Sequence, residues 1–411
     1  MPRILLLLPT TTYRSADFLA AAGKLGAEVT VATDEASAVE SLNPEGLVTL
    51  DFRDPDRAAQ KAAGLARTRP FDAVIGVDDE SSVAAAAIAR ALGLRHNAVS
   101  SAAAARDKGE MRRRLAEAGV SVPRHFLFVR KETSPRDAAR LVTYPCVVKP
   151  TFLAASRGVI RADSAEELIA AWERIERILD QPDVASRGGE AAGRILVEEF
   201  VPGREVALEG MLSGGRLRVL ALFDKPDPLD GPYFEETIYV TPSRESDAVQ
   251  ESITAVAQDG ARALGLAEGP IHAELRLAAS GPVVIEVAAR SIGGLCSRTL
   301  RFGTRMSLEE LILRNAIGLP AEDRREDAAA GVMMIPTPRE GVLERVRGLE
   351  EAKAVPGIVE ASITLLPGQR LVPLPEGSRY LGFLFSRAET ADKAERALRA
   401  AHAKLTIEVA G

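Results

Sequence analysis

The stretch IHAELRLAASGPVVIEVAAR, residues 271–290, predicts two short strands, 271–277 and 283–288, joined by a tight turn at 279–281. Polar and apolar residues alternate along both strands, so every second side chain shares a face. One face of the predicted hairpin then carries His272, Glu274, Arg276, Val284, Glu286 and Ala288. In this register Glu274 and Glu286 lie directly opposite each other, with their side chains about 5 Å apart.

Two carboxylates held this close repel each other unless a positive charge lies between them. A hard divalent cation would remove the repulsion, and Arg290 follows Glu286 by four residues. The plainer alternative is a pair of solvated glutamates on an exposed sheet face, which is a common surface pattern. The hairpin alone favours neither interpretation, so the rest of the chain has to decide.

The composition is that of a globular protein with more than one domain. The 411 residues are 46% hydrophobic and 27% charged. The net charge of -6 argues against a general nucleic-acid binder and against a protein that binds anionic membranes. The apolar run 4–8 is too short for a signal peptide or a membrane span. The two cysteines, Cys146 and Cys296, lie far apart and outside any CxxC pattern, so we expect a cytoplasmic protein.

Residues 1–100 alternate between apolar strands and amphipathic helices, which predicts a parallel, doubly wound α/β sheet. The turn 9–12 after the first strand lacks the GxGxxG fingerprint, which argues against a dinucleotide site there. The acidic run Asp78-Asp79-Glu80 ends a later strand, at the carboxyl edge where such sheets usually bind ligands. After residue 100 we expect a single helix over 102–118, a flexible insertion over 180–193 and a linker over 322–330.

Several charged residues stand at the ends of apolar strands. Lys149 ends one such strand, where a buried ammonium group needs an anion. The loop 151–158 that follows has small residues and backbone N–H groups, which suit it to close over phosphates. Glu198 and Glu205 flank a tight turn, where a carboxylate can accept from a ribose hydroxyl or an exocyclic amine. Each feature alone has a plain structural explanation, and only their order along the chain is specific.

In that order, these residues resemble the ATP-grasp superfamily of ligases. The matching stretches are RDKGEMRRRLAEAGVSVP around Lys108, VVKP at Lys149, ILVEEFVPGREVALEG, GPIHAELRL and VVIEVAARSIGG, over roughly residues 100–318. Within the superfamily the chain is most similar to the L-amino acid ligases, which join two amino acids into a dipeptide. The stretch PYFEETIYVTPS and the tail that begins GVMMIPTPREGVLERVRGLEEAKAVPGI carry this closer resemblance.

The resemblance implies an ATP-grasp fold with α/β and α+β parts. The domains it implies are an N-terminal doubly wound α/β domain (1–100), an ATP-grasp domain (101–320) with a lid at about 142–203, and a C-terminal α+β domain (321–411). Residues implied for ATP are Lys108, Lys149, Ser156, Glu198, Glu199, Val201, Glu205 and Lys225. Among these, Lys149 would lie near the phosphates, Glu198 beside the adenine and Glu205 beside the ribose.

The resemblance also assigns residues to the metal and the substrates. Glu274 and Glu286 would hold Mg²⁺ or Mn²⁺, and Arg290 would meet the reacting carboxylate. Glu236 would recognise the α-amino group of the first amino acid. Further substrate contacts and acyl-centre groups would be Tyr239, His272, Gly293 and Gly294.

The sequence departs from the family pattern in three places. The usual Glu-x-Asn metal motif is here Glu286-Val287-Ala288, so one metal or phosphate contact is missing or is supplied elsewhere. The often glycine-rich phosphate loop is TFLAASRG, which predicts a stiffer loop. Tyr239 stands where these ligases often have histidine.

The function that follows is an ATP-dependent carboxylate–amine ligase. It would form an amide through an acyl phosphate, most directly between two amino acids, and release ADP and phosphate. One alternative is a bicarbonate-using carboxylase of the same fold, biotin-carboxylase-like or from the purine pathway. Another is a nucleotide-binding regulatory protein with a degenerate site. We expect small-molecule substrates and no nucleic-acid or membrane partner, and the apolar first domain is compatible with a homodimer.

Overall fold

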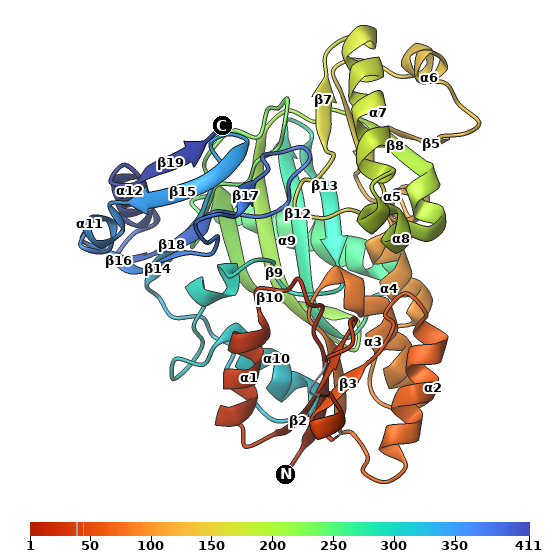
Figure 1. Ribbon diagram of the computed structural model, residues 1–411, viewed down its shortest axis with the longest axis vertical. Helices are drawn as coiled ribbons and strands as arrows, with labels where there is room; N and C mark the ends of the chain where they lie inside the picture. Colours follow the sequence, from red (N-terminus) through yellow and green to blue (C-terminus); the bar gives the residue numbers. More distant parts are fainter. Residues whose placement is uncertain (38–39, 44) are drawn as a thin grey trace.

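Four β-sheets and the helices packed on them make up the part of the protein that the computed structural model describes, residues 1–37, 40–43 and 45–411. In Figure 1 the N-terminal part, red to orange, lies at the bottom, and the lid lies at the upper right. The C-terminal part, in blue, lies at the upper left. A long central sheet in green and cyan connects the three.

The N-terminal part is the parallel, doubly wound sheet that the sequence predicts. Its strands, in spatial order, are β3 (Leu47–Thr49), β2 (Glu28–Thr33), β1 (Arg3–Leu7) and β4 (Ala73–Gly76). Its helices are α1 (Ser15–Lys24), η1 (Glu40–Leu42), α2 (Pro55–Ala66) and α3 (Asp79–Ala91). Because side chains alternate along β1, Leu5 and Leu7 pack with α2 and α3, whereas Ile4 and Leu6 pack with α1. Both faces are covered, as in other parallel sheets.

Two helices replace the single helix expected over 102–118. Helix α4 (Val99–Arg106) ends one residue before Asp107, and α5 (Lys108–Glu117) begins one residue after it. The Asp107 carboxylate accepts hydrogen bonds from the backbone N–H groups of Gly109 and Glu110, at 2.8 and 3.1 Å. This cap interrupts the helix and places Lys108 in the first turn of α5, on the wall of the cavity described below.

An antiparallel sheet forms the lid. Its strands, in spatial order, are β5 (His125–Val129), β8 (Arg194–Glu199), β6 (Cys146–Pro150) and β7 (Ile160–Ala162). Its helices are α6 (Pro135–Leu141), α7 (Ala165–Leu179), α8 (Pro182–Gly188) and η2 (Gly189–Gly193). The expected flexible insertion over 180–193 is therefore largely helical, because Pro182 opens α8 and Val184 packs into the lid core. Strand β5 belongs to this sheet although it precedes residue 142.

The largest sheet runs through the central and the C-terminal parts. Its strands, in spatial order, are β13 (Gly281–Ala288), β12 (Gly269–Ala278), β9 (Arg204–Ser213), β10 (Arg216–Lys225), β11 (Ile238–Thr241), β14 (Ala329–Ile335), β18 (Gly382–Ala388) and β16 (Ile358–Ile363). The two parts join at the antiparallel pair β11–β14, where Tyr239 lies opposite Val332. Strand β14 begins inside the expected linker 322–330, so the C-terminal part extends the sheet that carries the site.

Helix α9 (Asp247–Leu264) covers one face of this sheet. Its Ile253 and Ala257 pack with Leu275 and Val287 of the hairpin, which leaves the other face of β12 and β13 for the cavity. The remaining elements are η3 (Cys296–Thr299), α10 (Leu308–Ala316), α11 (Leu349–Lys353), α12 (Ala391–His402) and a small sheet of β17 (Arg370–Leu371), β15 (Gly341–Arg347) and β19 (Thr406–Ala410). Among the described residues, no helix combines the length and apolar character that crossing a membrane requires.

Candidate active site

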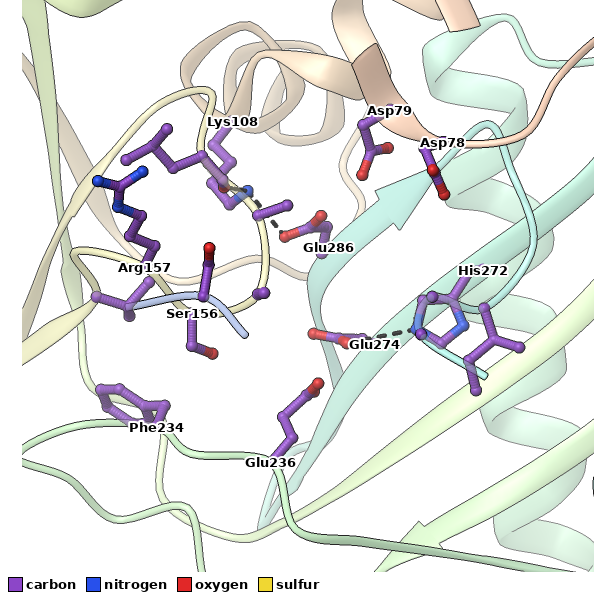
Figure 2. Close-up of a pocket in the computed structure, with 18 of the residues that line it drawn as sticks. Asp78, Asp79, Lys108, Ser156, Arg157, Phe234, Glu236, His272, Glu274 and Glu286 are labelled. Carbon is purple, nitrogen blue, oxygen red and sulfur yellow. Dashed lines mark hydrogen bonds and ion pairs between the residues drawn. The ribbon is translucent and has the colours of Figure 1, made fainter. Parts of the chain in front are cut away.

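A cavity of about 840 Å³ lies where all parts of the chain meet. Its walls include Tyr13 from the N-terminal part, Ser156 from the lid, Glu274 and Glu286 from the central sheet and Tyr380 from the C-terminal part. Figure 2 shows the Glu274 and Glu286 side chains reaching into this space from neighbouring strands. Every residue that the sequence assigned to a site lines the cavity except Lys225, which is buried.

The predicted opposition of Glu274 and Glu286 is confirmed, because the two residues are paired across β12 and β13. Their carboxylates bind different lysines, however. Glu286 Oε2 lies 3.0 Å from Lys108 Nζ, and Glu274 Oε1 lies 3.2 Å from Lys225 Nζ. The repulsion expected between the two carboxylates is thus relieved by two separate ammonium groups.

The rest of the predicted hairpin needs two corrections. A β-bulge shifts the register after Glu274, so that Leu275 pairs with Val284 and Ile285 is the extra residue. Val284 therefore packs on the α9 side with Leu275 and does not share a face with Glu286, whereas Ile285 joins Glu286 on the cavity wall. The turn is also shorter than predicted, since Ala278 pairs with Gly281 across two intervening residues.

Lys225 lies at the centre of three carboxylates. Its Nζ is 2.7 Å from Glu205, 2.5 Å from Glu236 and 3.2 Å from Glu274. Burial alone would lower the pKa of Lys225, but these carboxylates outweigh it and raise the pKa well above its usual value. Burial likewise would raise the pKa of Glu274, yet Lys225 and His272 hold it well below its usual value. Lys225 and Glu274 therefore favour each other's charged form.

The donor chemistry around Glu274 and Glu286 fits a magnesium ion. The carboxylate oxygens of Glu205, Glu236 and Glu274 approach within 4.8 Å of one another, which would also suit a cation. The ammonium group of Lys225 already lies between the carboxylates of Glu205, Glu236 and Glu274. Glu274 and Glu286 are both partly exposed and line the cavity, whereas Glu205 of the other set is buried, so the pair Glu274 and Glu286 offers the more accessible oxygens.

Lys149 of β6 and Glu198 of β8 form a buried ion pair within the lid sheet. Lys149 Nζ lies 2.5 Å from Glu198 Oε2, and Arg112 of α5 binds the other oxygen, Oε1. Burial alone would raise the pKa of Glu198, but Arg112 and Lys149 outweigh it and lower the pKa to about 2. Desolvation lowers the pKa of Lys149. Both oxygens of Glu198 are engaged, so the carboxylate orients Lys149 at the strand end.

The residues assigned to the adenine and ribose differ in their surroundings. The Glu199 side chain points to the surface and pairs with Arg124 at 2.8 Å, so only its backbone faces the cavity side. Glu205 accepts from Arg276 Nε at 3.0 Å in addition to Lys225. The same arginine donates to the Val201 carbonyl at 2.8 Å. Arg276 thus ties the turn between β8 and β9 to the site.

The phosphate-loop candidate, residues 151–158, lies over the cavity. Lys108 binds this loop through its backbone N–H to Thr151 O at 2.8 Å and through Nζ to Leu153 O at 2.9 Å. Ala155 and Ser156 both have positive φ, 53° and 55°, which is unfavourable for residues with a side chain. Their backbone is held in this strained form where the loop crosses the site (Figure 2).

Arg290 is anchored to the N-terminal part. Its Nε and Nη2 both donate to Asp79 Oδ2, at 2.9 and 2.8 Å. Asp79 raises the pKa of Arg290 against the opposing effect of burial. Gly293 and Gly294 follow on the cavity wall; Gly294 has a φ of 58°, and a Cβ there would lie 3.3 Å from the Phe383 ring, so glycine suits this position.

Glu236 and His272 complete the wall. The Tyr239 hydroxyl donates to Glu236 Oε1 at 2.6 Å, so tyrosine hydrogen-bonds this carboxylate at the position where the family often has histidine. The His272 ring lies between Glu209, at 3.2 Å, and Glu274, at 3.3 Å. These two carboxylates outweigh burial and raise the pKa of His272 to about 9. Ala288, directly opposite His272, is fully buried and contributes no polar atom.

The sequence missed four charged residues that the structure brings to the site: Arg14, Arg112, Glu209 and Arg276. Two of them carried a usable signal. Glu209 interrupts the buried apolar run of β9, and Arg276 shares a face with Glu274, so each needed a buried partner. The others are ordinary in sequence and become significant only through contacts over long sequence distances.

Family models match successive parts of the chain. An ATP-grasp N-terminal domain matches residues 19–96, an ATP-grasp domain matches residues 142–299, and an L-amino acid ligase C-terminal domain matches residues 333–410. These three matches follow the same order as the three parts that the sequence predicts.

Individual relatives agree with this pattern. The alanine–anticapsin ligase of Bacillus subtilis is 29% identical over 215 residues, which are 49% of this chain and 44% of that protein, so the chain spans less than half of that relative's length. An L-amino acid ligase from Bacillus licheniformis has a crystal structure with a TM-score of 0.85 and 27% identity, over 100% of this chain and 99% of that one. The N5-carboxyaminoimidazole ribonucleotide synthetase of Thermotoga maritima, with a TM-score of 0.72 and 16% identity over 100% of both chains, shows likeness in fold alone.

Proposed function

Since the chain belongs to the ATP-grasp family, in the group of the L-amino acid ligases, we propose that it uses ATP to join a carboxylate to an amine. The products are an amide, ADP and phosphate, and the substrates best supported are two amino acids. The juxtaposition of Lys149, Arg290 and the pair Glu274 and Glu286 around one cavity carries the proposal.

The chemistry follows from the charges on the cavity wall. A carboxylate is a poor acyl donor, and its phosphorylation by ATP gives an acyl phosphate that an amine can attack. Lys149 and Arg290 offset the negative charge that develops during phosphoryl transfer. Glu274 and Glu286 are the residues to hold magnesium, which when bound neutralises phosphate charge.

Amide formation needs a bound first amino acid and the exclusion of water. Glu236 is the residue to accept from the α-amino group of that first amino acid, since Lys225 and Tyr239 both donate to its Oε1 and among the described residues none donates to Oε2. Gly293 and Gly294 line the cavity, and their backbone N–H groups are the donors we assign to the acyl centre. The loop 151–158 covers the site and protects the acyl phosphate from hydrolysis.

A panel of amino acid pairs tests this proposal. Purified protein is incubated with ATP, Mg²⁺ and each pair, and released phosphate and new amides are measured together. We expect phosphate release with a subset of pairs, matched by an amide whose mass is the sum of the pair minus water. An Arg290→Ala variant serves as the inactive control. Phosphate release that requires bicarbonate and yields no amide would contradict the proposal.

A further inference from the structure

The Asp79–Arg290 contact joins the N-terminal domain to the residue proposed to meet the reacting carboxylate. Asp79 is the first residue of α3, directly after the N-cap Asp78, and both line the same cavity as Glu286 (Figure 2). Arg290 lies 211 residues away in sequence, just beyond the end of β13. The acidic run 78–80 has no role in the proposed reaction so far. Through Asp79 it binds Arg290, a residue of that reaction.

The hydrogen bonds of Arg290 leave one edge of its guanidinium group open. A guanidinium has five N–H donors in a fixed plane. Two of them go to Asp79, and Nη1 donates a third to the Ser291 carbonyl at 3.1 Å. The remaining two, one on Nη1 and one on Nη2, have no acceptor among the described residues, and Arg290 lines the cavity, so this open fork is available to a carboxylate or phosphate.

The two residues after Arg290 are held from buried positions as well. Arg14 Nη2 donates to Ser291 Oγ at 2.7 Å, and its Nη1 donates to the Val77 carbonyl at 3.0 Å, at the end of β4. The Ile292 N–H donates to Glu209 Oε2 at 2.9 Å. The segment that follows Arg290 is therefore held by Arg14 of the N-terminal domain and by Glu209 of the central sheet.

Asp79 also competes with a second carboxylate for the arginine. Glu286 is close enough to Arg290 to contribute to its raised pKa, after Asp79 itself. Without Asp79, the strongest nearby attraction for the guanidinium would be Glu286, a proposed metal ligand. Asp79 holds the charge away from that ligand.

We propose that Asp79 is a positioning residue that keeps the open fork of Arg290 turned toward the acyl phosphate. The N-terminal domain then contributes a positioning residue to the active site. This inference rests on the proposed function, because it assumes that Arg290 meets the reacting carboxylate.

Three substitutions test it: Asp79→Ala, Asp79→Asn and Asp79→Glu. The matched control is Asp56→Asn, since Asp56 also stands in the first turn of a helix of this domain and pairs with an arginine, Arg90, at 3.6 Å, but lies outside the cavity. For Asp79→Ala we expect kcat to fall by about 10²-fold with the KM for ATP within about twofold, because misplacement of a catalytic group by about 1 Å costs this much. Asp79→Glu should recover part of the loss. Because Asp79→Ala leaves the guanidinium group of Arg290 without its carboxylate and should lower the melting temperature, kcat is compared at a temperature at which every variant is folded.

A spectroscopic readout separates this inference from the proposed function. In ¹⁵N-arginine spectra, the Arg290 Nε–H should exchange slowly with solvent in the wild type and rapidly in Asp79→Ala. Retained slow exchange in Asp79→Ala, or a kcat within about threefold of the control, would overturn the positioning role. Absence of phosphate release by the wild type would contradict the proposed function instead, and the exchange measurement would still show whether Asp79 anchors Arg290.

Discussion

Glu274 and Glu286 stand directly opposite each other on β12 and β13, and each is neutralised by a lysine from a different element. Lys108 comes from the first turn of α5, and Lys225 ends β10. The carboxylates can bind a magnesium ion only if the two ammonium groups share or release them. Metal binding should therefore depend on both carboxylates.

Replacing either carboxylate should weaken magnesium binding. We expect Glu286→Gln and Glu274→Gln each to reduce Mg²⁺-ADP affinity and phosphate release at least tenfold, since loss of residues that only support metal ligands already costs 10- to 100-fold. Isothermal titration of Mg²⁺-ADP measures binding without turnover. Glu344→Gln, at an exposed position on β15, is the control. Unchanged Mg²⁺ dependence in Glu286→Gln would refute this assignment.

The buried pair of Lys149 and Glu198 predicts a pH-dependent stability. In the folded protein the pKa of Glu198 is about 2, below its usual value near 4.5. The pair's contribution to stability is therefore complete above about pH 4.5 and is lost as the pH falls toward 2. Glu198→Gln leaves two buried cations unpaired and should lower the free energy of unfolding by roughly 3 kcal/mol at pH 7. Glu199→Gln, whose carboxylate pairs at the surface, should cost less than about 1 kcal/mol. Urea denaturation at pH values from about 2.5 to about 7 measures the free energy of unfolding of both variants. Equal losses in the two variants would contradict the account.

Among the ion pairs that connect the lid to the rest of the described residues, two come from the lid helices α7 and α8. Arg187 of α8 lies 2.7 Å from Glu80, beside Asp79, and Arg174 of α7 lies 2.5 Å from Glu376 in the C-terminal part. These pairs are half-exposed, so Arg187→Ala and Arg174→Ala should change stability by less than about 1 kcal/mol.

Their effect should instead appear in lid closure. We expect faster hydrogen exchange in residues 151–158 and more ATP hydrolysis without amide formation, because water reaches the acyl phosphate. Arg140→Ala, in the lid helix α6 with a partner in the same helix, should leave both unchanged. Tight coupling of hydrolysis to amide formation in Arg187→Ala and Arg174→Ala would show that the pairs do not control the lid.

Tyr239 should tune substrate affinity through Glu236. Tyr239→Phe removes the 2.6 Å hydrogen bond to Glu236 Oε1, worth about 1 kcal/mol, and should change the KM for the amino acid about fivefold with a smaller effect on the KM for ATP. Tyr144→Phe removes a similar hydrogen bond in the lid, from its hydroxyl to the Ala139 carbonyl at 2.9 Å, and is the control. Equal KM values for Tyr239→Phe and the control would argue against contact between Glu236 and the α-amino group of the first amino acid.

The sequence predicts the parts of this molecule that depend on local pattern. Strict alternation places Glu274 opposite Glu286, and the strand–helix order predicts the N-terminal sheet. The bulge at Ile285 is not visible in the sequence, because Val283, Val284 and Ile285 are all apolar and a change of face among them leaves the pattern unaltered. The break between α4 and α5 was readable in principle, since Asp107 is a common N-cap residue.

Contacts between distant residues could not be predicted in this way. Asp79 and Arg290 are 211 residues apart, and Arg14 and Ser291 are 277 apart. Nothing in either local sequence specifies the partner, because acidic residues in a helix's first turn and single arginines are both ordinary in a sequence. The charged side chains around Lys225 were predicted as separate ligands for the same reason. Only the fold brings them into one cluster.

The acyl phosphate is the central claim, and transfer of ¹⁸O tests it most directly. An amino acid labelled with ¹⁸O in its carboxylate is incubated with ATP, Mg²⁺, a productive amine and the protein, and the phosphate and amide are analysed by mass spectrometry. The account predicts one ¹⁸O in each phosphate released and one lost from the acyl part of the amide. Unlabelled phosphate accompanying amide formation would contradict it.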